Sequence, residues 1–152
     1  MRRFLPLISL LFCAALAQAA SPERFFPTDE GERAEYAVVL EFGEARLSGI
    51  CVVKRMEGRL AGSMLNEFGI RAFDFRCGEG DRRAELSNVT AFLDRWYIRR
   101  TLRRDLALLL NHEGGSQAET RRGRSIATLE DGSLYMRHLH RKMSYRFVPL
   151  NP

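Results

Sequence analysis

The chain of 152 residues lacks the short motifs that mark common enzymes and metal sites. It contains no G-x-S-x-G, no phosphate-binding loop, no H-E-x-x-H and no C-x-x-C. His138 and His140 are two residues apart and share a face if they lie on a strand, but a metal site needs a third ligand. The alternative to metal binding is that both histidines lie on a strand face exposed to solvent. We therefore predict that the protein is not an enzyme and holds no metal or cofactor.

Long apolar runs are also missing after the first twenty residues. Those twenty begin with Arg2 and Arg3, continue with an apolar run and end in Ala17-Gln18-Ala19, the order of a secretory signal peptide. The run is short for a membrane span, which needs about 20 residues. We predict a signal peptide at 1–19, cleaved after Ala19, and a soluble periplasmic protein. A lipidated Cys13 is the rival interpretation, disfavoured by the bulky residue before it.

Cysteine is scarce, and the net charge is small. Without the two arginines of the signal peptide, which contains no acid, the formal charge falls from +5 to +3. So mild an excess does not indicate a nucleic-acid partner. Two of the three cysteines, Cys51 and Cys77, follow the predicted cleavage site. An oxidising compartment permits a disulfide between them, and the alternative is two small buried strand residues.

Period-two apolar patterns and glycine turns predict a mostly antiparallel β protein. A loose segment, 20–34, precedes a single domain at 35–152. The Leu- and Arg-rich segment 92–111 lacks glycine and proline and predicts a helix, with Thr90 as a reasonable N-cap. The polar segment 112–124 reads as a flexible link. Strands are expected at 36–42, 47–56, 59–65, 70–77, 84–89, 125–130, 133–139 and 143–150. We therefore predict an α+β fold in which a curved, unclosed half-barrel of about eight strands packs on one helical segment.

The stretch Asn66-Glu67-Phe68-Gly69 interrupts two strand patterns. Glu67 has no catalytic partner nearby, whereas Gly69 supplies backbone freedom and Asn66 tolerates a left-handed conformation. We predict a corner of the sheet at the mouth of a cavity.

Two sets of side chains are candidates for binding. The basic set, typical of a solvated face or of a contact with anionic headgroups or a membrane surface, is Arg95, Arg99, Arg100, Arg103 and Arg104. The apolar set, which suits either a packed core or the lining of an acyl-binding cavity, is Phe42, Met64, Phe68, Phe73, Phe75, Trp96 and Met136.

The order of these elements resembles the LolA/LolB-like superfamily of bacterial lipoprotein-localisation proteins. The resemblance rests on the strand at 48–53, on Gly62-Ser63-Met64-Leu65, on the triplet Glu67-Phe68-Gly69 and on the leucine-rich helix. The chain also looks similar to uncharacterised exported proteins of the Bacteroidetes type. The resemblance implies an unclosed barrel with an apolar cavity for acyl chains. One helix instead of several, and the lack of a convincing lipidation cysteine, depart from that pattern.

Together these observations predict a carrier that binds an acyl lipid or a lipidated protein, with no nucleic-acid partner. The alternative is a non-enzymatic interaction module of the cell envelope with a filled core. A hydrolase without a recognisable motif is the third possibility.

Overall fold

The computed structural model describes residues 24–150. The predicted signal peptide, its cleavage site and Cys13 lie outside these residues and stay predictions.

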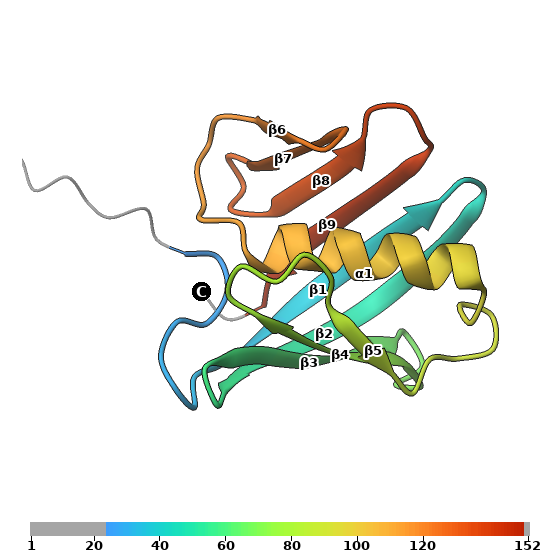
Figure 1. The fold of residues 1–152 in the computed structure, drawn as a ribbon, viewed down its shortest axis with the longest axis horizontal. Helices are drawn as coiled ribbons and strands as arrows, with labels where there is room; N and C mark the ends of the chain where they lie inside the picture. Colours follow the sequence, from blue (N-terminus) through green and yellow to red (C-terminus); the bar gives the residue numbers. More distant parts are fainter. Residues whose placement is uncertain (1–23, 151–152) are drawn as a thin grey trace, which may run out of the picture.

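Within residues 24–150, nine strands form one antiparallel sheet in the order β5-β4-β3-β2-β1-β9-β8-β7-β6 (Figure 1). The strands are β1 (Arg33–Phe42), β2 (Ala45–Met56), β3 (Arg59–Asn66), β4 (Arg71–Gly78), β5 (Glu85–Ser87), β6 (Glu119–Arg121), β7 (Arg124–Thr128), β8 (Leu134–His138) and β9 (Met143–Pro149). The sheet is curved and unclosed and packs on a single helix within the described residues, which confirms the predicted α+β class. The ninth strand, β6, was not expected, because it is three residues long and lies in the segment read as a polar link.

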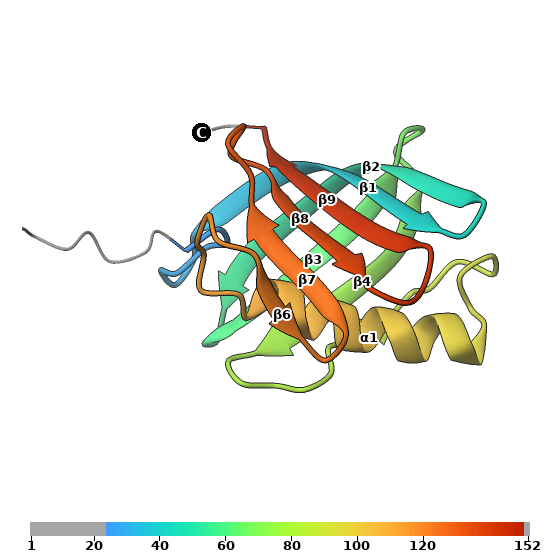
Figure 2. The same ribbon diagram turned by 90° about the horizontal axis from the view of Figure 1, so that it is seen from above.

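The helix, α1 (Trp96–Leu110), lies along the concave side of the sheet (Figure 2). It begins four residues later than the sequence pattern predicted. The carbonyl of Thr90 accepts hydrogen bonds from the backbone N–H groups of Leu93 and Asp94, so the predicted N-cap belongs to a separate turn. Arg95 occupies the N-cap position without a capping side-chain bond, and the first turn carries no acid.

The core fills the space between α1 and the sheet. Alternate residues of β1 face inward, as Tyr36, Val38 and Leu40 show, and α1 contributes Leu102, Leu106 and Leu109 at helical spacing. Burying such a side chain contributes about 1.5–3 kcal/mol. These side chains therefore hold the helix against the sheet.

The β3–β4 turn confirms a reversal of the chain at residues 66–69, whereas a place at the mouth of a cavity stays a prediction. The side-chain oxygen of Asn66 accepts hydrogen bonds from the backbone N–H groups of Phe68 and Ile70, at 3.0 and 2.9 Å. Gly69 has φ +74°, a conformation that costs glycine nothing. Before the turn, β2 and β3 approach so closely at Gly49 that a Cβ there would lie 1.8 Å from the carbonyl oxygen of Leu65.

A buried carboxylate joins α1 to the C-terminal half of the sheet. Asp105 is fully buried. Its Oδ2 accepts a hydrogen bond from the hydroxyl of Tyr145 on β9 at 2.5 Å and lies 2.7 Å from Nε2 of His138 on β8. Its Oδ1 accepts a hydrogen bond from Nε of Arg124 on β7 at 2.9 Å. One side chain of the helix thus contacts three consecutive strands.

The position of His138 corrects a sequence interpretation. We expected His138 and His140 to share a solvated strand face, but His138 is buried against Asp105 and His140 lies beyond the end of β8, exposed. Burial, followed by the charge of Asp105, raises the pKa of Tyr145 well above its ordinary value, so Tyr145 stays protonated as a donor.

We expect Asp105→Ala to lower the free energy of unfolding by about 3–5 kcal/mol, because it strands the Arg124 charge and two other donors in the interior. Tyr145→Phe removes one donor to the carboxylate and should cost about 1.5–3 kcal/mol. Urea denaturation of the two variants beside the unmodified protein measures both. A loss below about 1 kcal/mol for Asp105→Ala would contradict the anchoring role.

Candidate functional site

Four segments meet at one end of the half-barrel. They are the β1–β2 hairpin, the β3–β4 turn, residues 88–95 and the β8–β9 turn, and we call this the hairpin end (Figures 1 and 2). Side chains of this end and of the adjoining first turn of α1 are unusually apolar for a surface. Exposed large hydrophobic residues there are Phe68, Ile70, Phe92, Trp96, Tyr97 and Leu139. Exposed apolar patches of this kind mark contact or ligand sites.

A groove of about 760 Å³ opens at the hairpin end, within the size range of small-molecule sites. Its walls come from the β1–β2 hairpin, the start of α1 and the β8–β9 turn. The apolar lining consists of Phe42, Ala45, Phe92, Leu93, Tyr97, Ile98 and Met143. Three cations, Arg95, Arg141 and Lys142, complete it together with Gly43 and Thr101.

The described residues that line the groove carry charge of one sign, because none of them is an acid. One rim cation, Lys142, lies 3.9 Å from the exposed Glu44 beside the groove. The first turn of α1, which contributes Tyr97 and Ile98, has no acid either, so no acidic side chain of that turn offsets the positive end of the helix dipole. An apolar floor with a positive rim suits a molecule that has an apolar body and an anionic group.

Local contacts fix the groove walls. The backbone N–H of Gly43 donates to the carbonyl of Lys142 at 2.6 Å, which ties the β1–β2 hairpin to the β8–β9 turn. The ring of Phe42 packs edge-on against Tyr145, with centroids 6.0 Å apart. Because the Tyr145 hydroxyl donates a hydrogen bond to Asp105, the floor of the groove packs directly against the buried network around Asp105.

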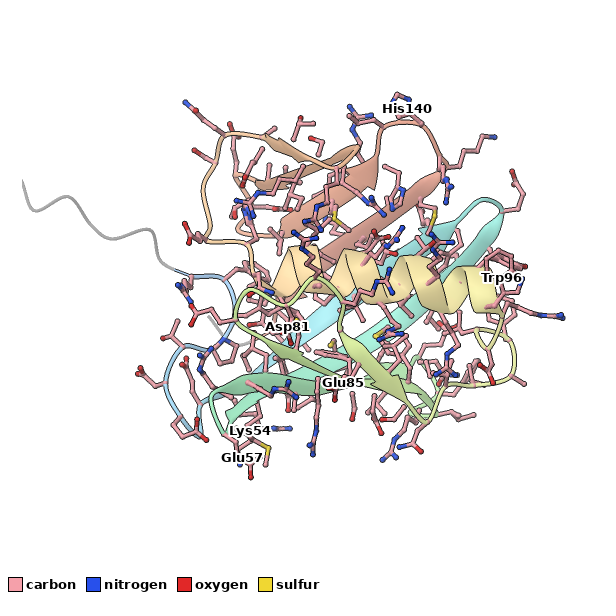
Figure 3. The ribbon with its side chains drawn as sticks, in the orientation of Figure 1. Lys54, Glu57, Asp81, Glu85, Trp96 and His140 are labelled. Carbon is pink, nitrogen blue, oxygen red and sulfur yellow. The ribbon has the colours of Figure 1, made fainter. Side chains whose placement is uncertain are left out.

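The predicted apolar set does not form one lining, which is a correction. Phe42 alone among these residues lines the groove. Phe68 and Trp96 are 79% and 74% exposed. Trp96 points away from the interior (Figure 3). The remaining four pack in the filled core between α1 and the sheet, because the curvature of the sheet brings them face to face with the helix. They are Met64, Phe73, Phe75 and Met136.

The predicted basic set divides between two sides of α1. Arg95 is at the groove rim. Arg99, Arg100 and Arg103 face the other side, beside the loop before β5, together with Trp96. Arg104 follows them one turn after Arg100, as helical spacing requires.

The structure does not pair Cys51 with Cys77; both are buried free thiols. Strand β3 lies between them, where Cys51 is opposite Met64 and Cys77 is opposite Leu60. Two strand spacings and four residues of offset separate the Cα atoms by about 16 Å, whereas a bridge needs less than about 7 Å. Burial raises the pKa of the thiols to about 12 for Cys51 and about 11 for Cys77, so neither is a reactive thiolate.

Sequence reasoning missed Phe92, Tyr97, Arg141, Lys142 and Met143 as site residues. Phe92, Arg141, Lys142 and Met143 lie in or beside turns, where side-chain direction follows from tertiary contacts, and Tyr97 lies at the start of α1. The Arg141-Lys142 pair before the last strand was the available signal, because consecutive cations at a hairpin tip can serve as a rim.

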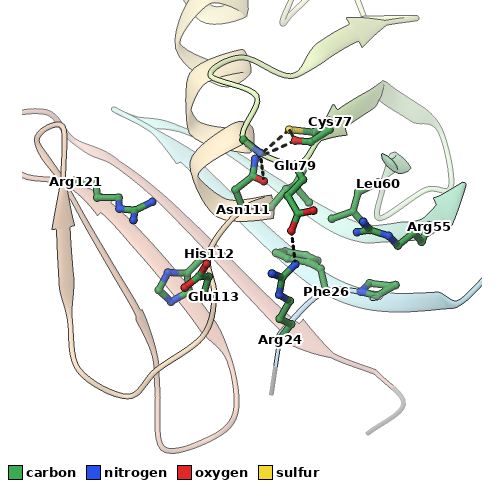
Figure 4. Close-up of a pocket in the computed structure, with 14 residues that line it drawn as sticks. Arg24, Phe26, Arg55, Leu60, Cys77, Glu79, Asn111, His112, Glu113 and Arg121 are labelled. Carbon is green, nitrogen blue, oxygen red and sulfur yellow. Dashed lines mark hydrogen bonds and ion pairs between the residues drawn. The ribbon is translucent and has the colours of Figure 1, made fainter. Parts of the chain in front are cut away.

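A second hollow, of about 280 Å³, lies near the C-terminal end of α1 (Figure 4). The ion pair between Arg24 and Glu79 closes one side of it, at 3.0 Å. His112 lines it with a side chain that is only 3% exposed, and its Nε2 has no hydrogen-bond partner among the described residues. Residues of both charge signs line this hollow, so its electrostatics favour no one class of charged ligand.

Burial lowers the pKa of His112 below its ordinary value of 6.5, against the weaker opposing effect of Glu119, whose Oε2 lies 3.6 Å from Nδ1. The unfolded chain therefore binds this proton more readily than the folded protein does. Stability from this residue is complete above pH 6.5 and falls as the pH drops toward the lower folded-state pKa. We expect the free energy of unfolding to decline between about pH 7 and pH 5, and His112→Gln to reduce that decline. Denaturation curves at both pH values measure it; an equal decline in the variant would contradict the assignment.

Within residues 24–150, no helix is long and apolar enough to cross a membrane, and no three His, Cys, Asp or Glu side chains are placed to hold a metal ion. Comparisons with protein-family models, with curated proteins and with solved structures find no match to this chain. The resemblance to the LolA/LolB-like superfamily therefore has no support from them and stays a prediction.

Proposed function

We propose that this protein binds the acyl chain of an anionic amphiphile, a lipid or a lipidated protein, in the groove at the hairpin end. The observation that carries the proposal is the groove itself: an apolar floor with Arg95, Arg141 and Lys142 at its rim and no acid in its lining. Each methylene group removed from water contributes about 0.8 kcal/mol, so a partly buried chain supplies useful affinity. The cations hold the anionic head at the surface.

The surroundings of the groove support exchange at a membrane surface. The exposed aromatic residues of the hairpin end include Trp96 and Tyr97, the side chains that favour the headgroup layer of a bilayer. With the signal peptide predicted at 1–19, the protein acts as a soluble carrier in the periplasm.

The packed core limits how the chain is held. Met64, Phe73 and Met136 leave no room for an acyl chain between α1 and the sheet without displacing them. The acyl chain therefore lies in the groove at the end of the half-barrel rather than through the centre of the half-barrel.

Displacement of a dansyl-labelled fatty acid tests the proposal. Two variants change the groove: Arg141→Glu with Lys142→Glu reverses the rim, and Ala45→Trp fills the floor. We expect the rim variant to weaken fatty-acid binding by roughly tenfold while binding of a fatty alcohol is little changed. Ala45→Trp should weaken both ligands, because it occupies their space.

The matched control reverses two exposed arginines outside the groove, Arg76→Glu with Arg137→Glu, and should leave both affinities unchanged. No binding by the unmodified protein, or equal losses in the rim variant and the control, would contradict the proposal.

A second candidate function is a non-enzymatic interaction module of the cell envelope, favoured by the filled core. It predicts a protein partner recovered by crosslinking from the envelope and no fatty-acid displacement. The Ala45→Trp variant distinguishes the two candidates, because it removes acyl binding and leaves the rest of the surface intact.

A further inference from the structure

A cleft of about 270 Å³ lies beside α1, on the side away from the groove. Four arginines and one tryptophan line it: Arg83, Trp96, Arg99, Arg100 and Arg103. The four helical residues follow one another at intervals of three, one and three, which places them on one face. Groove residues of the helix, such as Tyr97 and Thr101, lie on another face.

Backbone contacts fix the position of the cleft wall. The N–H of Ala84 donates to the carbonyl of Arg103 at 2.8 Å, and Nε of Arg103 donates to the carbonyl of Ala84 at 2.9 Å. Ala84 is fully buried. This reciprocal pair of bonds docks the loop before β5 on the helix and brings Arg83 next to the helical arginines.

The positive charge of the cleft is only partly compensated. Arg99 pairs with Asp94 at 2.7 Å, but Arg83 and Arg100 form no ion pair within the described residues. The excess positive charge also affects the neighbouring Arg104. The pKa of its guanidinium is lowered first by the charge of Arg100, then by slight desolvation, and then by Arg83 and two further arginines. Like charges held together in this way are stabilised by a bound anion.

The shape and composition of the cleft select among anions. Arginine side chains gathered around one small hollow suit a phosphate group, which accepts several guanidinium hydrogen bonds at once. Nucleic acid instead requires a longer track of cations along its backbone. The indole of Trp96, 74% exposed, favours the headgroup layer of a bilayer. The exposed ring of Tyr97 packs against it, with centroids 5.9 Å apart.

We propose that this cleft binds the phosphate group of an anionic membrane lipid, with Trp96 resting in the headgroup layer. The cleft is a second site, separate from the acyl-binding groove. Binding there would hold the hairpin end, and with it the groove, at the bilayer surface.

Trp96 is the only tryptophan of the chain, so its fluorescence reports on the site directly. The purified protein is titrated with phosphatidylcholine vesicles that either contain or lack phosphatidic acid. We expect a blue shift with the anionic vesicles alone. Arg83→Gln with Arg100→Gln should weaken this binding by at least roughly tenfold.

The matched control, Arg82→Gln with Arg104→Gln, removes the same charge from the neighbouring residues and leaves the cleft intact. It should weaken vesicle binding much less. An equal loss in the control would overturn the proposal, because the attraction would then be diffuse. Fatty-acid displacement from the groove should be normal in both double variants. A failure of the phosphate-binding proposal is therefore distinguishable from a failure of the acyl-binding proposal.

Two further arms test the source of the phosphate. Glycerol phosphate should compete with the vesicles, as shared chemistry requires. A shift of Trp96 fluorescence with glycerol phosphate but none with anionic vesicles would overturn the lipid assignment, as would tighter binding of a nucleic-acid oligomer.

Discussion

The arrangement of this protein depends on one buried carboxylate. Asp105 is removed from water completely, and an ion in that position is tolerated only when its oxygens are bonded. Three strands supply those bonds through Arg124, His138 and Tyr145. Apolar contacts are non-directional and would hold α1 against the sheet in more than one register. The directional bonds to Asp105 define one position of the helix along the C-terminal half of the sheet.

That position creates the two surfaces to which we assign functions. Tyr145 bonds to Asp105 and packs against Phe42, so the floor of the groove is supported by the same network. On the opposite face of α1, Ala84 and Arg103 hold the loop before β5 in place and assemble the arginine cleft. One side therefore offers apolar surface with a positive rim, and the other offers a small cleft lined by four arginines. Both lie beside the exposed aromatic residues of the hairpin end, the part of the molecule that we propose meets a bilayer.

The fold was predictable because its local signals agree. The alternation of Tyr36, Val38 and Leu40 and the turn at Asn66 depend on neighbours in sequence, and both were read correctly. The anchor was missed although signals for it exist: His138 continues the inward face of Leu134 and Met136, and Asp105 lies on the apolar face of the helix between Leu102 and Leu109. A polar residue on the apolar face of a helix and another on the inward face of a strand indicate that the two side chains are buried together and bonded to each other. The groove and the short strand β6 could not be predicted, because they arise from contacts between segments distant in sequence.

The most direct test of the account is the position of a bound acyl chain. A fatty acid that carries a spin label near its methyl end broadens the amide NMR signals of the residues closest to it. We expect broadening at 42–45, 92–101 and 141–143, the three segments that line the groove. Broadening confined to the second hollow around His112, or no broadening at saturating fatty acid, would contradict the account.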